Sequence, residues 1–415
     1  MARYVILTDE AGSKGQAHRF GVPEHLLAST RPRSCCPGLL TLDLDMHQLR
    51  EVTRDKDIVA IAPVMPISLI APVEPTSTTP PETPNGWSAP ALNLPTRCEA
   101  TDSPPIVAIL DTGLDQEHPA FDGTPLVTRD FVGTGMKDIH GHGTHIAGTI
   151  LGKPLDGISI GLLPNISAGV IAKILNYTGL GVSQHLLEGL LWAADQASII
   201  CTSVYFDTQR HIQDLIHSGL PRTQAFDAAL SATYANQNLL RSLITMLQLP
   251  GPGLLVFSGA GNSSRRTGPE QYETGSIAPM YSPGLLPVGA VRYGPDGTLL
   301  GTHFSNTGSS MVAPGENILS AASGGGLCRL SGTSMAAAYA AAMAALWWQA
   351  MPNVRANQVA EQMLSACDTS PLCRLLAPYD YGAGLVQGPA SEQSHIPKPA
   401  KITLAEQPFA QRPVA

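Results

Sequence analysis

Short apolar runs alternate with longer, mostly apolar stretches through the central and C-terminal parts of the chain. Five runs have the length and the Val and Ile content of buried strands: residues 106–110, 168–175, 197–204, 253–260 and 285–291. Three stretches are long enough for helices: residues 142–151, 182–197 and 332–348. Such alternation is typical of a mostly parallel sheet with helices on both faces. The pattern therefore predicts an α/β, three-layer fold with a twisted sheet between helices.

A different pattern occupies residues 1–72, which predict a small α+β domain. Its expected elements are strands at residues 4–8 and 39–45, a short helix at 46–54 after a capping Asp45, and an extended segment at 57–70. Residues 73–86 are rich in Pro and Thr and predict an exposed linker. The large domain then spans residues 87–388, and residues 389–415, which lack periodicity, predict a disordered tail.

Composition narrows the range of partners. With 415 residues, 43% of them hydrophobic and 14% charged, the chain can bury one large core and a smaller one. A net charge of -8 without a Lys or Arg run argues against nucleic acid and anionic membranes as partners. The N-terminus shows no signal peptide, and the longest apolar run, residues 335–348, is too short to span a bilayer. We therefore expect, by default, a cytoplasmic protein without a membrane partner, with export by a route that needs no signal peptide as the alternative.

Reactive groups in parallel α/β sheets gather where strands end and helices begin. Asp111 follows the strand expected at residues 106–110, and His142 opens the helix expected at 142–151. Each has a plain alternative, with Asp111 as a turn cap and His142 as a buried structural side chain. The glycines around His142 let backbone and substrate approach the imidazole, which favours a general base. A metal site is less favoured, because no Glu follows His142 as in H-E-x-x-H.

Asn262 and Ser334 lie at two further junctions of this kind. Asn262 ends a Gly-rich turn after the strand expected at residues 253–260, and Ser334 opens the helix at 332–348. Taken alone, Asn262 reads as a turn residue and Ser334 as a helix cap. Taken with an aspartate and a histidine, they supply a nucleophile, its base, a group that orients the base and an amide donor for an oxyanion. The set predicts nucleophilic catalysis by Ser334.

The sequence around these four residues resembles the subtilisin-like serine proteases, the subtilase family. The motifs are ILDTGLDQEHP at Asp111, HGTHIAGT from His142, GAGN ending at Asn262 and GTSMA around Ser334, in the family's order. The resemblance implies a subtilisin-like fold and a serine endopeptidase that acts on peptide or protein substrates without a cofactor. It assigns Asp111, His142 and Ser334 to the catalytic triad and Asn262 to the oxyanion hole.

The resemblance also implies which residues hold a peptide substrate. Gly179 and Gly181 correspond to one substrate-pairing edge, Ser203 and Tyr205 to the other, and Gly259 to a further substrate-binding position. Tyr205 stands where the family has glycine, so we expect its side chain to narrow or cover the groove and to restrict specificity.

Two segments carry expectations of their own. Residues 206–253 exceed what the family core needs and predict a lid or a docking surface for one dedicated substrate. Residues 1–72 resemble a subtilase propeptide in position and element order, which implies an intramolecular inhibitor and self-cleavage between about Ser68 and Trp87. A permanent accessory domain is the alternative for this unit.

Other chemistry stays open at this stage. A peptide transamidase or macrocyclase on the same scaffold needs a cap that excludes water, for which residues 206–253 are the candidate, and a catalytically silent binding protein is a third reading. Many subtilases bind calcium, but the loop at residues 151–161 offers Asp156 and few other oxygen ligands, so calcium stays an open alternative without a clear ligand set and no metal is assigned. The seven cysteines are expected as free thiols, although Cys367 and Cys373 can pair in an oxidising environment.

Overall fold

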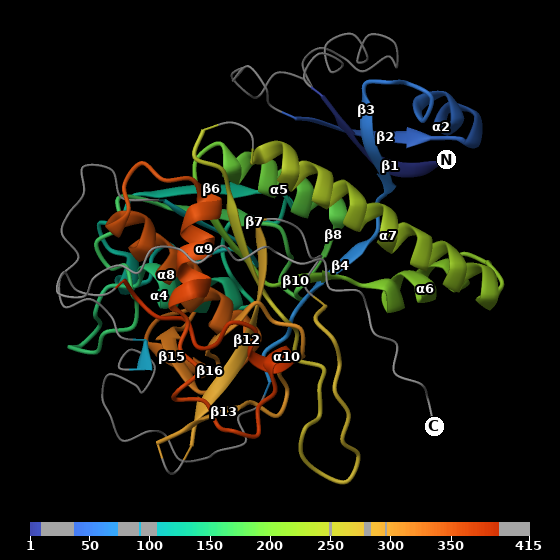
Figure 1. Ribbon diagram of the computed structural model, residues 1–415. Coiled ribbons are helices and arrows are strands. Elements are labelled where there is room, and N and C mark those ends of the chain that lie inside the picture. Colours follow the sequence, from blue (N-terminus) through green and yellow to red (C-terminus); the bar gives the residue numbers. More distant parts are fainter. Residues whose placement is uncertain are drawn as a thin grey trace.

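The computed structural model describes residues 1–9, 37–73, 91–92, 106–248, 251–277, 284–294 and 297–389 (Figure 1). The predicted linker at 73–86 and tail at 389–415 lie outside this set except for their first residues. The expected secondary structure of the small N-terminal unit and of the large unit can therefore be compared with the structure, element by element.

A sheet of eight strands forms the centre of the large unit. Its strands are, in spatial order, β13 (Leu299–Gly301), β12 (Leu285–Tyr293), β11 (Leu255–Gly259), β9 (Ile199–Thr202), β5 (Val107–Asp111), β7 (Gly169–Lys173) and β6 (Leu126–Asp130), with β14 (Met311–Pro314) also paired to β12. Only the pairing of β12 with β13 is antiparallel among these strands. The predicted α/β fold with a mostly parallel sheet is confirmed.

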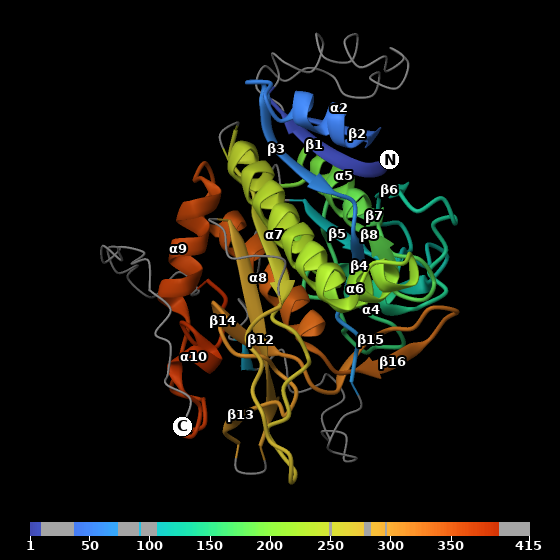
Figure 2. The same ribbon diagram turned by 90° about the vertical axis from the view of Figure 1, so that its right-hand side faces the viewer.

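Both faces of this sheet are buried, which explains the continuous apolar runs. In β5, Val107 and Ile109 belong to one core cluster and Ala108 and Leu110 to another, because successive strand residues point to opposite faces. Three helices contribute to the first cluster: α4 (His142–Leu151), α8 (Thr333–Ala350) and α9 (Ala356–Ala366). Two cover the second: α5 (Ser183–Ala194) and α7 (Arg222–Leu247) (Figure 2).

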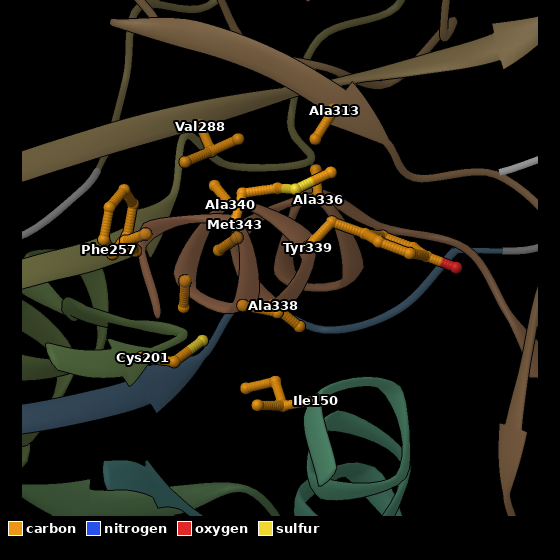
Figure 3. Packing of buried hydrophobic residues seen from close by; sticks show 14 of the residues in the cluster. Ile150, Cys201, Phe257, Val288, Ala313, Ala336, Ala338, Tyr339, Ala340 and Met343 are labelled. Atoms are coloured by element: carbon orange, nitrogen blue, oxygen red, sulfur yellow. The ribbon is translucent and has the colours of Figure 1, made fainter. Parts of the chain in front are cut away.

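Helix α8 is buried from Thr333 to Trp348 and forms the middle of the first cluster. Its many alanines let the helix backbone come close to β11, β12 and α4. Figure 3 shows Met343 and Ala340 of this helix near Val288 and Phe257, and Ala338 on its other side, towards Ile150 of α4. Close packing of small side chains explains why a helix with no polar face is stable here.

The N-terminal unit is a three-stranded antiparallel sheet in the order β2 (Gly38–Leu44), β1 (Ala2–Thr8), β3 (Ile58–Pro63), with helix α2 (Met46–Val52). Asp45 caps α2 as expected, accepting hydrogen bonds from the backbone N–H groups of His47 and Gln48. One apolar set of this unit, which includes Ile6 and Val52, forms a small separate core. The other, which includes Val5 and Leu7, joins the cluster of α5 and α7, so the two units share one apolar interface (Figure 1).

The segment at 206–253 packs against the N-terminal unit, and its predicted role as a lid or a docking surface for a substrate stays a prediction. It contains α6 (Thr208–His217) and the long helix α7, and α7 packs against β3 of the N-terminal unit. Buried Asn236 of α7 donates a hydrogen bond to the carbonyl oxygen of Pro63 at 2.8 Å. This segment therefore supports the N-terminal unit, a role that the sequence pattern did not indicate because the contact is between residues far apart in the chain.

The remaining elements are β4 (Pro66–Leu69), β8 (Leu180–Val182), β10 (Val204–Phe206), a 3₁₀ turn η2 (Pro119–Phe121), the hairpin of β15 (Ile318–Ala321) and β16 (Leu327–Leu330), and α10 (Pro378–Tyr381). Cys367 and Cys373 are both free thiols, so the pairing considered from the sequence is not formed. Within the described part of the chain, no helix has the length and apolar character needed to cross a membrane.

Candidate active site

Asp111 and His142 meet at the carboxyl end of β5. Asp111 is the last residue of this strand and His142 is the first residue of α4. Nδ1 of His142 lies 2.8 Å from Oδ1 and 2.9 Å from Oδ2 of Asp111, and both residues are 1% exposed. A buried carboxylate in this position fixes the ring and stabilises an imidazolium, as an aspartate paired with a catalytic base must do.

Lys173 holds the turn after Asp111 by hydrogen bonds from its buried ammonium group. It ends β7, beside Asp111 in the parallel ladder, and its Nζ donates to the carbonyl oxygens of Thr112 at 2.8 Å and Lys137 at 2.9 Å. Burial lowers the pKa of Lys173, while the nearby carboxylates of Asp138 and Asp130 raise it. The sequence analysis missed this residue, although a single lysine inside an apolar strand was a signal of a buried, partnered charge.

Asp138 joins the end of β5 to the start of α4. Its fully buried carboxylate accepts hydrogen bonds from the Thr112 hydroxyl at 2.8 Å, from the Gly141 N–H at 2.9 Å and from both the N–H and the hydroxyl of Thr144 at 2.8 Å. These bonds hold the first turn of α4, and with it His142, against the strand that carries Asp111. The sequence analysis missed Asp138 as well, although an acidic residue shortly before a Gly-rich helix start is typical of a cap.

Ser334 and Asn262 are fixed by the first residue of α8. The N–H and the hydroxyl of Thr333 each donate to Oδ1 of Asn262 at 2.9 Å, and the hydroxyl of Thr333 accepts from the N–H of Gly261 at 3.0 Å. Ser334, the second residue of α8, is 1% exposed. With its carbonyl oxygen held by Thr333, the Asn262 amide keeps its NH₂ group free to donate elsewhere.

A strand of the N-terminal unit lies across this group of residues. Strand β4 pairs antiparallel with β10 on one side and with β8 on the other. Beyond β4, the Ser334 hydroxyl donates to the carbonyl oxygen of Ile70 at 3.3 Å, and Nδ2 of Asn262 donates to that of Ala71 at 2.8 Å. The segment then continues to Val73, whose N–H donates to the carbonyl oxygen of Ser331 at 2.9 Å. Ser334 and Asn262 thus contact the same short segment.

Four of the five residues predicted to hold substrate line this segment. The Gly179 carbonyl accepts from the N–H of Leu69 and the Ser203 carbonyl from that of Ile70, each at 2.8 Å. Gly181 pairs with Ile67 and Tyr205 with Ser68. Gly259 lies instead against the turn at Thr333 and Ser334, where an added Cβ would come within 3.1 Å of the Ser334 nitrogen.

Tyr205 does not cover the groove, because a strand fits beside it, and the expected narrowing and restricted specificity stay predictions. Its backbone forms an ordinary antiparallel pair with Ser68, and β4 fits between the two edges. Burial and the charge of Asp207 raise the pKa of Tyr205, and a hydrogen bond with the Ser68 side chain acts in the opposite direction. The aromatic side chain therefore borders the bound strand rather than replacing it.

His142 is not hydrogen-bonded to Ser334 in this arrangement. Nε2 of His142 is buried and has no hydrogen-bond partner within the described ranges, while the Ser334 hydroxyl is directed to Ile70. The neighbouring His140 ring lies 6.3 Å from that of His142 between centroids, and its Nε2 is close to Gly179. The pKa of His140 is lowered by burial and by His142.

His145 and His118 have structural surroundings. Nε2 of His145 lies 3.0 Å from the carbonyl oxygen of Ile318, and burial lowers the pKa of His145 to about 3. Nδ1 of His118 accepts from the N–H of Ala120 and caps η2. For metals, the ranges that the structure describes contain no group of three or more His, Cys, Asp or Glu side chains placed to hold an ion.

Comparison with known proteins gives a consistent result. The sequence profile of the subtilase family matches residues 102–384. Subtilisin-like protease 6 of Trichophyton schoenleinii is 29% identical over 239 residues, which are 57% of this chain and 51% of that protein. The intracellular serine protease of Paenibacillus polymyxa is 29% identical over 249 residues, 58% of this chain and 65% of that protein. The chain thus spans about half the length of the fungal relatives it matches.

Two solved structures share the fold. Fervidolysin from Fervidobacterium pennivorans, described as a keratinolytic enzyme related to subtilisin, matches with a TM-score of 0.63 at 20% identity over 93% of this chain and 60% of that chain. Sphericase matches with a TM-score of 0.52 at 23% identity over 74% of this chain and 99% of its own.

Proposed function

The chain belongs to the subtilase family, and on this basis we propose that it is a serine endopeptidase with Asp111, His142 and Ser334 as its catalytic triad. One observation carries the proposal. An extended segment of the chain lies in the groove between β8 and β10, with consecutive carbonyl groups at Ser334 and Asn262. A groove that binds backbone in this way has the form needed to present a peptide bond to a nucleophile.

The chemistry follows from the positions of the groups. His142 takes the hydroxyl proton of Ser334 through Nε2, while Asp111 holds the Nδ1–H and stabilises the imidazolium. The serine oxygen bonds to the peptide carbonyl carbon, and the negative oxygen that forms accepts hydrogen bonds from Nδ2 of Asn262 and from the Ser334 N–H at the start of α8. His142 then gives its proton to the leaving amine as the C–N bond breaks. Water releases the acyl group from Ser334 by the same steps in reverse.

The N-terminal segment is the intramolecular inhibitor in this proposal. Ser334 contacts the carbonyl of Ile70, whereas Asn262 contacts that of Ala71. Attack requires one carbonyl whose carbon faces the hydroxyl while its own oxygen lies in the oxyanion hole. With the two groups on successive carbonyls, the segment fills the groove without being set for cleavage. To cut Ile70–Ala71, the Ile70 carbonyl oxygen must move to Asn262, and to cut Ala71–Pro72, the Ser334 hydroxyl must turn to the Ala71 carbonyl carbon; in both cases β4 keeps its pairing with β8 and β10.

The same segment suggests restricted specificity. Ile67, Leu69 and Ile70 are 0%, 6% and 2% exposed, so the groove encloses apolar side chains on both sides of the strand. We expect protein or peptide substrates with apolar residues at these positions. Transfer to an amine in place of water needs a cap over the groove, and the segment considered for that cap supports the N-terminal unit instead. Hydrolysis is therefore the reaction proposed.

Intact mass over time tests the proposal, using the wild type, Ser334→Ala and a control, Ser218→Ala, at the exposed end of α6. We expect the wild type and the control to lose a fragment that ends at Ile70 or Ala71, and Ser334→Ala to stay whole. Each protein is then given casein. Casein cleavage that survives in Ser334→Ala would contradict the assigned nucleophile, and three proteins that all stay whole would contradict self-processing.

A further inference from the structure

The carboxylate of Asp207 contacts the Ser68 side chain of β4, the strand that occupies the groove. Asp207 directly follows β10 and is the N-cap of α6. Its Oδ1 accepts from the N–H of Arg210 at 2.9 Å, and its Oδ2 accepts from the Ser68 hydroxyl at 2.7 Å. The Asp207 N–H also donates to the carbonyl oxygen of Pro66 at 3.0 Å.

The contact is enclosed. Ser68 is 6% exposed and lies opposite Tyr205 in the ladder. Helix α6 packs against both β4 and α7, so Asp207 is held in place on a fixed element. Strand β10 with its Tyr205 is followed directly in the chain by Asp207 and then by the first turn of α6. This one stretch therefore supplies the charge, the helix start that orients it and the ring beside it.

From this arrangement we propose that Asp207 selects substrates with a hydroxyl side chain, serine or threonine, at the position that Ser68 occupies, two residues before Ile70. The inference rests on the proposed function, because it treats β4 as the stand-in for a substrate strand. A carboxylate is a strong acceptor for a hydroxyl, and alanine or valine at this position leaves Oδ2 without its donor. Glutamate or aspartate brings a like charge, and the small exposure of Ser68 leaves little room for a long side chain.

Two peptide pairs test the selectivity in the self-processed protein. The octapeptides PISLIAGV and PIALIAGV differ only in the side-chain hydroxyl at the third position. The octapeptides PITLIAGV and PIVLIAGV differ in the hydroxyl at the same position, with a side chain of nearly the same shape. For the wild type we expect the hydroxyl peptide of each pair to have a kcat/KM about tenfold higher, the size of one hydrogen bond to a charged group. Cleavage is followed by mass spectrometry, which also reports the bond that is cut.

Three variants separate the contact from general effects. Asp207→Asn keeps an oxygen at this position without the charge, and Asp207→Ser still caps α6 but is too short to reach Ser68. We expect the hydroxyl preference to fall to about threefold in the first and to be lost in the second. The control Asp214→Asn removes the same charge from an exposed position on the same helix and should keep the wild-type preference.

A second measurement does not need turnover. In the Ser334→Ala protein, Ser68→Ala and Asp207→Ser are made singly and together, and the shifts in Tm are compared. A Tm shift of the double variant that is smaller than the sum of the two single shifts supports the contact. A shift equal to that sum overturns it. A wild type that cleaves both peptides of each pair equally also overturns this inference while leaving the protease assignment intact. Absence of cleavage of all four peptides removes the proposed function and this inference with it.

Discussion

The buried His145 predicts a specific loss of stability in acid. Its pKa in the folded protein is lowered by burial from 6.5 to about 3, and it regains the ordinary value when the chain unfolds. Between these two values the unfolded chain binds a proton that the folded chain does not, so the free energy of unfolding falls as pH decreases. His145→Gln removes the titrating group but keeps an N–H that can donate to the carbonyl oxygen of Ile318.

The size of this effect follows from the same values. Lowering the pH from well above 6.5 to 5 spans 1.5 units of the interval between the two pKa values, and each unit is worth about 1.4 kcal/mol. His145 should therefore account for about 2 kcal/mol of the stability lost between pH 7.5 and pH 5. Other titrating groups contribute equally to the wild type and the variant, so the difference between the two proteins isolates this residue.

The assay is urea unfolding followed by tryptophan fluorescence at both pH values, in a Ser334→Ala background that prevents self-digestion. We expect the loss of stability on going to pH 5 to be about 2 kcal/mol smaller in His145→Gln than in the parent. The overall stability of the variant does not enter this comparison. Equal losses in the two proteins would show that His145 has the same pKa in the folded and the unfolded chain, which would refute the reasoning.

Two further predictions concern the groups around the reaction. Asn262→Ala should lower kcat on peptide substrates by a factor of about a hundred to a thousand with little change in KM, since its amide acts on the oxyanion, and an unchanged kcat in steady-state kinetics would remove Asn262 from that role. Lys173→Met should lower the free energy of unfolding by about 1–3 kcal/mol because the carbonyls of Thr112 and Lys137 lose their donor; urea unfolding measures this, and wild-type stability would contradict it.

The sequence predicted the elements well where local pattern decides them. The strands of the large sheet are buried on both faces, so each appears as a short apolar run such as residues 106–110. The start of α4 at His142 and the buried course of α8 were equally readable. In the structure His142 contacts Asp111, and Ser334 and Asn262 contact one segment, which agrees with the grouping inferred from the sequence; their catalytic roles stay predictions.

The remainder depends on contacts between distant parts of the chain. Nothing in residues 66–69 shows that they pair with both 180–182 and 204–206, because a strand of four residues carries little information about its partners. Asp207 is an ordinary surface-type residue in the sequence, and only the fold gives its carboxylate the Ser68 hydroxyl as a partner. The role of the long helix α7 in holding β3 likewise depends on the tertiary arrangement.

The shared apolar interface of the two units has a consequence for the timing of activity. A cut after Ile70 or Ala71 severs one covalent link but leaves β4 in its ladder and Val5 and Leu7 in the common core. In the proposed self-processing, the inhibitor then changes from a tethered group, with a very high effective concentration, to a separate chain governed by mass action. Dilution, or destruction of the released fragment, thus becomes the step that frees the groove, and the onset of proteolysis should depend on protein concentration.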